Sequence, residues 1–167
     1  METVKIIKHQ DISYNEKLEI CKIKSVFGNY SVESQLKWMD KNLDSNDLHF
    51  LVYDNKKLIA YSNFINISII INNDIIKAIG VGNVCSAEQA KGYGKLLMQQ
   101  VNSFIKSKDI VGVLLCKESL IKFYENYSWI RIAKEKMKLH FTSEHVELML
   151  YNYKTSIDSL EYSGDTF

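Results

Sequence analysis

The stretch Val84–Ile105, "VCSAEQAKGYGKLLMQQVNSFI", joins three kinds of local structure within 22 residues. An extended run ends near Ser86, a short polar turn carries Gly92 and Gly94, and a helical pattern begins at once. The apolar residues of that pattern fall at i, i+4, i+7 and i+8, the spacing of an amphipathic helix; they are Leu97, Val101, Phe104 and Ile105. The stretch therefore predicts a strand, a glycine turn and a helix in direct succession.

Glycines at such a junction have a chemical consequence. A residue without a side chain lets a ligand approach the backbone closely. The first N–H groups of a helix have no intrahelical partners, and the helix dipole adds partial positive charge at the same end. The turn at Gly92 and Gly94 is therefore a candidate site for a phosphate or a diphosphate.

Two common phosphate-binding motifs do not fit this turn. A dinucleotide-binding G-x-G-x-x-G/A fingerprint requires a small residue where Leu97 stands, and it belongs to an early βαβ unit rather than after a three-strand meander. A P-loop requires Ser or Thr where Leu96 follows the Gly94–Lys95 pair, and a further glycine five residues before Gly94. The turn thus belongs to another class of anion site.

The chain before this turn alternates between extended and helical patterns. Strands are predicted over residues 3–9, 48–54, 58–71 and 75–84, and tight turns at "NKK" and "NND" join the last three. A first helix runs from about Ser13 to Phe27, with Ile20 and Ile23 at helical spacing. A second helix begins at the capping residue Ser31 and places Leu36, Met39 and Leu43 on one face.

The chain after the turn continues the same alternation. The apolar run "IVGVLLC" predicts a strand buried on both faces, and Ser119 can cap a short helix that ends near Asn126. "WIRIA" and "HVELMLYNY" predict two closing strands, and residues 155–167 form a polar, poorly patterned tail. The whole order predicts one mixed α/β domain that spans residues 1–167.

Composition excludes several classes of function. The net charge is +1 over 167 residues, so the balance gives no support for nucleic-acid binding. No apolar stretch reaches the ~18–20 residues of a membrane-spanning helix, and we expect no membrane partner. The three cysteines, Cys21, Cys85 and Cys116, are widely spaced and odd in number. They argue against a disulfide framework and suit a reducing cytosol, which predicts a cytoplasmic location.

The residues of the turn, Gln89-Ala90-Lys91-Gly92-Tyr93-Gly94, read as [RQ]-x-x-G-x-[GA]. Further along, "SLIKFYENYSW" is similar to F-Y-x-x-x-G-[FW], with Ser128 in place of the glycine. With these two motifs the chain resembles the GNAT superfamily of N-acetyltransferases, over about residues 3–153. The resemblance implies a mixed, mostly antiparallel central sheet of about seven strands flanked by about four helices. The chain also shows a faint similarity to the aminoglycoside N-acetyltransferases.

The resemblance also implies a chemistry. A transferase of this family moves an acetyl group from acetyl-CoA to a primary amine of a small molecule or peptide, by direct attack in a ternary complex. In this chain it implies a pyrophosphate loop from Gln89 to Lys95, backbone donors to the oxyanion near Asn83 and Val84, and Tyr124 as proton donor to the leaving thiolate. The cofactor-binding residues it implies are Asn83, Val84, Gln89, Ala90, Lys91, Gly92, Tyr93, Gly94 and Lys95.

Other assignments stay open at this level. Tyr124 could instead be a packing residue, and no general base is assigned among Glu33, Glu88 and Glu118. Cys85 and Cys116 are interpreted as small buried hydrophobes. The four histidines are scattered and have no metal-binding spacing, so no metal site is predicted. The alternative functions are a catalytically silent CoA-binding or sensor module on the same fold, and a scaffold domain whose glycines serve turn geometry alone.

The resemblance places the amine acceptor against two segments, about residues 27–38 and 135–145. Tyr30 and Trp38 could line its pocket, although Trp38 could equally pack its own helix. The acidic residues Glu33 and Asp40 lie in or beside the first segment, which is a weak indication of a cationic acceptor. A homodimer is a further expectation, because dimers are common in families of this kind.

Overall fold

A computed structural model of the chain describes residues 1–26, 28–141 and 145–167. These residues form four α-helices, nine β-strands and three short 3-10 helices. The α-helices are α1 (Tyr14–Lys24), α2 (Val32–Asn42), α3 (Tyr93–Ser107) and α4 (Ile121–Glu125). The strands are β1 (Glu2–Lys8), β2 (Leu48–Asp54), β3 (Lys57–Ile71), β4 (Asp74–Ser86), β5 (Val111–Lys117), β6 (Ile130–Arg131), β7 (Met137–Leu139), β8 (Val146–Tyr151) and β9 (Leu160–Tyr162).

The hydrogen-bonded strand order is β1-β2-β3-β4-β5-β8-β6, with β9 paired to both β3 and β7. The chain divides into two compact units, and β3, β4 and α3 each contribute to both. The first unit comprises Met1–Ile65 and Gly82–Val101, and the second comprises Asn66–Val81 and Asn102–Phe167. The mixed, mostly antiparallel sheet and the four helices confirm the predicted fold class.

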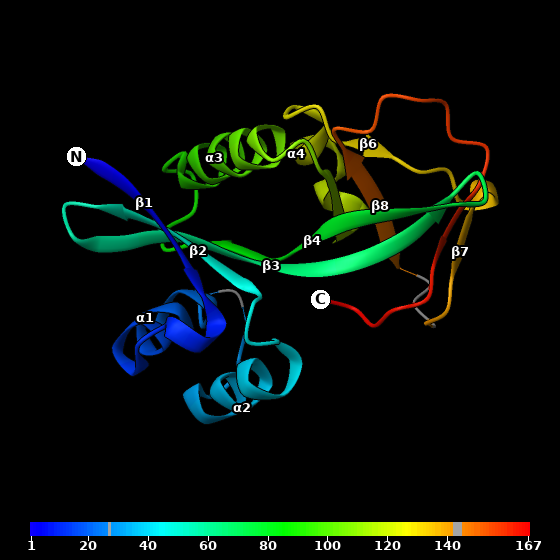
Figure 1. The fold of residues 1–167 in the computed structure, drawn as a ribbon. Helices are drawn as coiled ribbons and strands as arrows, with labels where there is room; N and C mark the ends of the chain where they lie inside the picture. Colours follow the sequence, from blue (N-terminus) through cyan, green and yellow to red (C-terminus); the bar gives the residue numbers. More distant parts are fainter. Residues whose placement is uncertain (27, 142–144) are drawn as a thin grey trace. The chain divides into compact units, whose positions relative to one another are not determined.

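In the first unit, β1, β2 and the first part of β3 are antiparallel neighbours, with a register shift between Val52 and Tyr53. Helices α1 and α2 pack on one face of these strands, and α3 begins on the other side (Figure 1). The core between the helices and the strands includes Ile20, Met39 and Leu51, which are fully buried. The side chains of Tyr61 and its hydrogen-bond partner His49, described below, lie on this face.

The sequence predicted the starts of both N-terminal helices. Ser13 caps α1 with a complete capping box, in which its side chain accepts from the Glu16 N–H and the Glu16 carboxylate accepts from the Ser13 N–H. Ser31 caps α2, accepting from the Ser34 N–H at 3.1 Å. The predicted helical position Phe27 lies outside the described residues.

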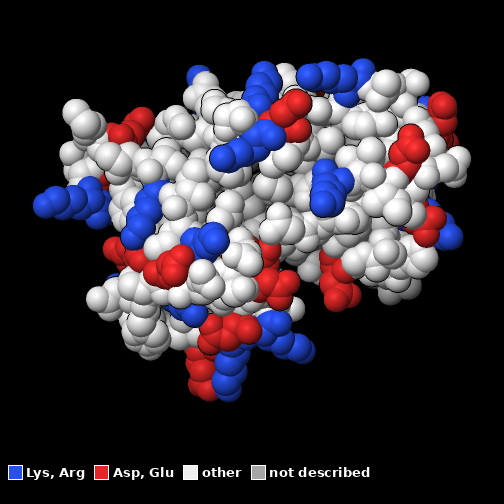
Figure 2. All heavy atoms as spheres, viewed as in Figure 1, with Lys and Arg blue, Asp and Glu red and all other residues white. Residues whose placement is uncertain are grey.

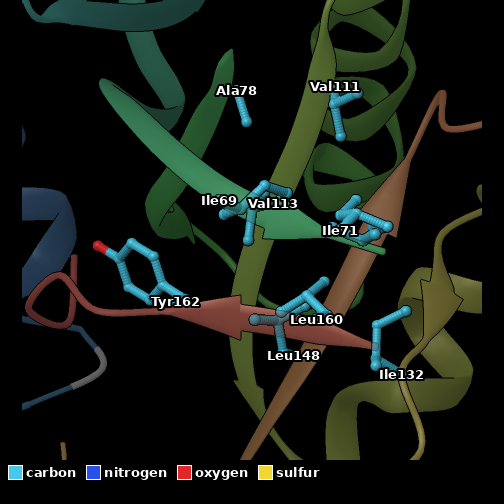
Figure 3. Packing of buried hydrophobic residues seen from close by; sticks show 10 residues of the cluster. Ile69, Ile71, Ala78, Val111, Val113, Ile132, Leu148, Leu160 and Tyr162 are labelled. Carbon is cyan, nitrogen blue, oxygen red and sulfur yellow. The ribbon is translucent and has the colours of Figure 1, made fainter. Parts of the chain in front are cut away.

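In the second unit, β4 pairs with β5 in parallel over Ala78–Gly80 and Val111–Val113, while β5 pairs with β8 in antiparallel. Aliphatic side chains from several strands meet in one core cluster (Figure 3). Its members shown in Figure 3 include Ile69, Ile71, Val113, Leu148 and Leu160.

One sequence prediction in this unit is wrong, and one strand was not predicted. Ser119 does not cap a helix, because it lies inside a 3-10 turn (Glu118–Leu120), and α4 begins after Leu120 without a side-chain cap. The tail, in which the sequence shows no clear pattern, contains a strand: β9 pairs with β3 through Ile70 and Ile71, and its residues Leu160 and Tyr162 are buried. A three-residue strand is too short to produce a readable alternation.

The surface carries no charge bias on the face seen in Figure 2, where acidic and basic side chains are interspersed. No helix in the described part of the chain is long and apolar enough to cross a membrane.

Candidate functional site

The turn between β4 and α3 has the backbone that its glycine predicts. Ala90 and Gly92 both take left-handed conformations, with φ of 60° and 77°. Helix α3 follows immediately, since the Leu96 N–H donates to the Gly92 carbonyl at 3.0 Å. A Cβ built on Gly92 would meet no atom within 4 Å, so this glycine borders open space. The left-handed φ, rather than crowding, is what favours glycine here.

The same turn presents its backbone outward. Residues 88–92 are exposed, and Tyr93, Gly94 and Lys95 form the first turn of α3, where N–H groups have no intrahelical acceptors. Lys91 and Lys95 are exposed beside these amides. The turn is anchored where it leaves β4 by the Ala87 N–H, which donates to the Ile59 carbonyl of β3 at 2.8 Å. The residues present can therefore hold a diphosphate through main-chain N–H groups and two ammonium groups.

Asn83 interrupts the regular pleat of β4 just before this turn. Its φ is 50°, in the left-handed region, and its side-chain amide donates to the Oδ1 atom of Asn63 on β3 at 2.7 Å. Asn63 is fully buried, and its Nδ2 atom has no partner among the described residues. The role of the Asn83 and Val84 backbone toward an oxyanion stays a prediction.

Tyr124 lies on α4 in the second unit and is 6% exposed. Its ring packs edge-on against Phe123, with centroids 5.0 Å apart, and against Trp129 at 6.5 Å. Tyr124 is therefore a packing residue in this structure. Its role as a proton donor stays a prediction.

The segment after α4 is held by a specific set of bonds. The Trp129 N–H donates to the Tyr124 carbonyl and the Ser128 N–H to the Glu125 carbonyl, the two bonds of a Schellman motif. Ser128 occupies its left-handed position with φ of 65°, where glycine is usual. Asn102 of α3 bridges this turn, donating to the Tyr127 carbonyl at 2.7 Å and accepting from the Trp129 Nε1 at 2.9 Å.

The three carboxylates considered as bases are all at the surface. Glu33 is 77% exposed and pairs with Lys37 at 2.7 Å, and Glu88 pairs with Lys57 at 3.4 Å. Glu118 is exposed in the turn before α4. All three side chains are therefore open to solvent rather than enclosed in a site.

The interpretation of the two thiols as buried holds for Cys116, whereas Cys85 is partly exposed. Burial raises the pKa of Cys85 to about 12 and that of Cys116 to about 11. A thiolate is the nucleophilic form of cysteine, and at neutral pH both side chains are thiols. Neither cysteine is therefore activated for a covalent acyl intermediate.

The segments expected to meet an acceptor differ in their exposure. Tyr30 is 69% exposed, whereas Trp38 is partly buried against the core of the first unit. The ammonium of Lys24 lies over the Trp38 ring, 4.8 Å from its centroid, and burial lowers the pKa of Lys24. A half-buried cation on this face opposes the expectation of a cationic acceptor. Residues 142–144 of the second acceptor segment lie outside the described residues.

Two of the histidines that seemed scattered come together. His9 Nδ1 lies 2.9 Å from His49 Nε2, and His49 Nδ1 lies 2.8 Å from the Tyr61 hydroxyl. Burial, with His9 and Lys17 nearby, lowers the pKa of His49 from 6.5 to about 3, so this imidazole is neutral. Sequence reasoning missed the cluster, although His49 lies two residues before Leu51 on the buried face of β2. Among the described residues, no three His, Cys, Asp or Glu side chains gather in a metal-binding arrangement.

Comparison of the sequence finds no matching protein-family model and no similar curated protein. Comparison of the structure finds many solved structures with the same fold. ElaA of Escherichia coli is 17% identical with a TM-score of 0.63, covering 90% of this chain and 99% of its own. The N-acetyltransferase PseH of Campylobacter jejuni is 18% identical with a TM-score of 0.59, covering 89% of this chain and 96% of its own.

A third structure was determined with a ligand. The N-acetyltransferase YlbP of Bacillus subtilis, in complex with coenzyme A, is 16% identical with a TM-score of 0.56 and covers 90% of this chain and 96% of its own. At these identities the likeness concerns the arrangement of the elements. This chain has the fold of the GNAT-type N-acetyltransferases.

Proposed function

We propose that the chain is an N-acetyltransferase that uses acetyl-CoA and acts on a primary amine of a small molecule or peptide. The observation that carries this proposal is the turn before α3, where left-handed Gly92 leaves exposed amides at a helix start, within a GNAT fold. The coenzyme A complex of YlbP supports a ligand of this class. Residues 89–95 would hold the pyrophosphate.

The reaction proceeds by direct attack of the neutral amine on the thioester carbonyl: a C–N bond forms and the C–S bond breaks. Backbone N–H groups at Asn83 and Val84 are proposed to stabilise the oxyanion. The hydroxyl of Tyr124 is proposed to give a proton to the departing thiolate. The raised pKa values of the Cys85 and Cys116 thiols support this route over one through an acyl-cysteine.

The second candidate is a CoA-binding or sensor module without transfer activity. The observation that favours it is that Glu33 and Glu88 are each engaged with a lysine at the surface, so neither is placed as a general base. The two candidates share the pyrophosphate turn and differ in turnover.

Calorimetric titration of the purified chain with acetyl-CoA and with CoA tests what both candidates share. The proposal predicts micromolar binding of both. A primary-amine panel with a thiol-release readout then separates them, because only the transferase releases CoA when an amine is added. Absence of binding to either compound would remove both candidates.

A further inference from the structure

Three ionisable side chains in the first unit form a continuous hydrogen-bonded line. His9 contacts His49 at 2.9 Å, and His49 contacts the Tyr61 hydroxyl at 2.8 Å. His9 is carried by the turn after β1, His49 by β2 and Tyr61 by β3, so three separate segments contribute one group each. Nothing in the proposed chemistry has yet used them.

The line runs from solvent into the core. At its outer end, His9 Nε2 lies 3.8 Å from the carboxylate of Asp40, which is 64% exposed and also accepts from Lys17 at 2.7 Å. The His9 side chain is 11% exposed, and both His49 and Tyr61 are almost completely buried. His49 is completely buried and needs a partner on each ring nitrogen, which His9 and Tyr61 supply.

The inner end of the line reaches β4 at Cys85. On either side of Cys85, β4 is joined to β3 by the bond from the Ala87 N–H to the Ile59 carbonyl and by the bond between the Asn83 and Asn63 side chains. The side chain of Cys85 packs against the cluster that contains Tyr61 and lies close enough to act electrostatically on the Tyr61 hydroxyl. Cys85 is partly exposed and directly follows Val84, where the thioester is expected.

We propose that His9, His49 and Tyr61 form a proton relay, which takes the proton released by the acceptor amine near Cys85 and delivers it to solvent beside Asp40. This inference rests on the proposed function. It supplies a proton acceptor in place of Glu33, Glu88 and Glu118, none of which is enclosed in a site. The amine of a typical substrate has a pKa of ~10.4 and must lose a proton before or during attack.

One proton enters the relay and one leaves it. The amine gives its proton to the Tyr61 oxygen while the Tyr61 hydroxyl proton passes to His49 Nδ1. The His49 Nε2 proton passes to His9 Nδ1, and the His9 Nε2 proton leaves toward Asp40 and solvent. Each imidazole gains and loses one proton and only exchanges tautomers, so no net charge stays on the buried His49.

The groups that face the relay set its behaviour with pH. The pKa of His9 is affected by the charges of Lys17, Asp40 and Asp47. The pKa of His49 is affected by His9, Lys17, Glu16 and Lys24, and that of Tyr61 by Cys21 and Cys85. Burial lowers the pKa of both histidines and raises that of Tyr61, which keeps all three groups neutral near pH 7. A neutral line is the condition for passing a proton without trapping it.

Tyr61→Phe tests the relay, because it removes one oxygen and keeps the ring. Tyr53→Phe is the matched control: Tyr53 packs against the same core, and its hydroxyl donates to Glu19 instead. With acetyl-CoA and a primary-amine panel, we expect Tyr61→Phe to lower kcat about ten-fold or more near pH 7. The difference in kcat between Tyr61→Phe and the wild type should become smaller as the pH approaches the pKa of the amine. Acetyl-CoA binding should stay unchanged, and Tyr53→Phe should behave as the wild type.

A wild-type rate and pH profile in Tyr61→Phe would overturn the relay and leave the proposed function standing. Absence of acetyl-CoA binding to the wild type would remove the proposed function and the relay with it. A second measurement needs no acceptor: long-range ¹H–¹⁵N spectra report the imidazole tautomers. The relay predicts that Tyr61→Phe shifts the ¹⁵N signals of His49 and His9, whereas Tyr53→Phe does not; unchanged signals in Tyr61→Phe would refute the connection.

Discussion

Acidification is predicted to destabilise the chain through one buried side chain, His49. Its pKa falls from 6.5 to about 3 because the imidazole is buried and His9 and Lys17 lie nearby. Unfolding releases the ring into water, where it takes up a proton below pH 6.5. The folded state therefore binds fewer protons, and its stability is complete above pH 6.5 and is lost as the pH falls toward 3.

The magnitude follows from these two pKa values. At about pH 5 the unfolded imidazole is almost fully protonated and the folded one is neutral, which costs about 2 kcal/mol relative to about pH 8. The full shift corresponds to a limit of about 5 kcal/mol, reached only near pH 3. A loss of about 2 kcal/mol is a large fraction of the about 5–15 kcal/mol by which domains are usually stable.

Urea unfolding followed by circular dichroism at about pH 8 and pH 5 measures this loss. His49→Gln, which cannot titrate, should lower stability at pH 8 but remove about 2 kcal/mol of the difference between the two pH values. His145→Gln, at an exposed histidine, is the control and should keep the wild-type difference. If His49→Gln showed the same loss between pH 8 and pH 5 as the wild type, the buried neutral imidazole would not be the cause.

Four further outcomes are expected. Gly92→Glu should abolish acetyl-CoA binding in calorimetry with its circular dichroism spectrum retained, whereas Gly92→Ala, which carries the same left-handed strain without the charge, should still bind; equal affinities would refute the pyrophosphate assignment. Tyr124→Phe should lower kcat more than it weakens acetyl-CoA binding, and an unchanged kcat would remove its role as acid. Ser128→Gly should raise the free energy of unfolding by about 1 kcal/mol in urea titration, because it relieves a left-handed serine; a loss of stability would contradict this. Cys85→Ser should keep at least a large part of the transferase rate in the thiol-release assay, and complete inactivation of a folded variant would point to a covalent route.

The fold was predictable because its main elements have long, regular patterns. Local structure is specified strongly by the capping residues Ser13 and Ser31, by the extended patterns of β2 and β3, and by the glycine turn before α3. Strand β9 was missed because it has three residues, and its burial comes from pairing with β3, far away in the sequence. Ser119 was assigned to a cap because the sequence does not show that a 3-10 turn precedes α4.

The candidate site was predictable only in part. The turn at Gly92 has a local signature, so its left-handed backbone could be anticipated. The line of His9, His49 and Tyr61 has none, since its members are 40 and 12 residues apart and meet only when β2 and β3 pair beneath the turn after β1. Similarly, nothing local to Asn83 indicates that its amide bonds to Asn63 across the sheet.

Calorimetric titration of the wild-type chain with acetyl-CoA tests the central claim most directly. The account predicts binding in the micromolar range, with CoA binding also, since both share the pyrophosphate that the turn before α3 is proposed to hold. No detectable heat for either compound, with no thermal shift of the folded chain, would contradict it and reduce Gly92 to a turn residue.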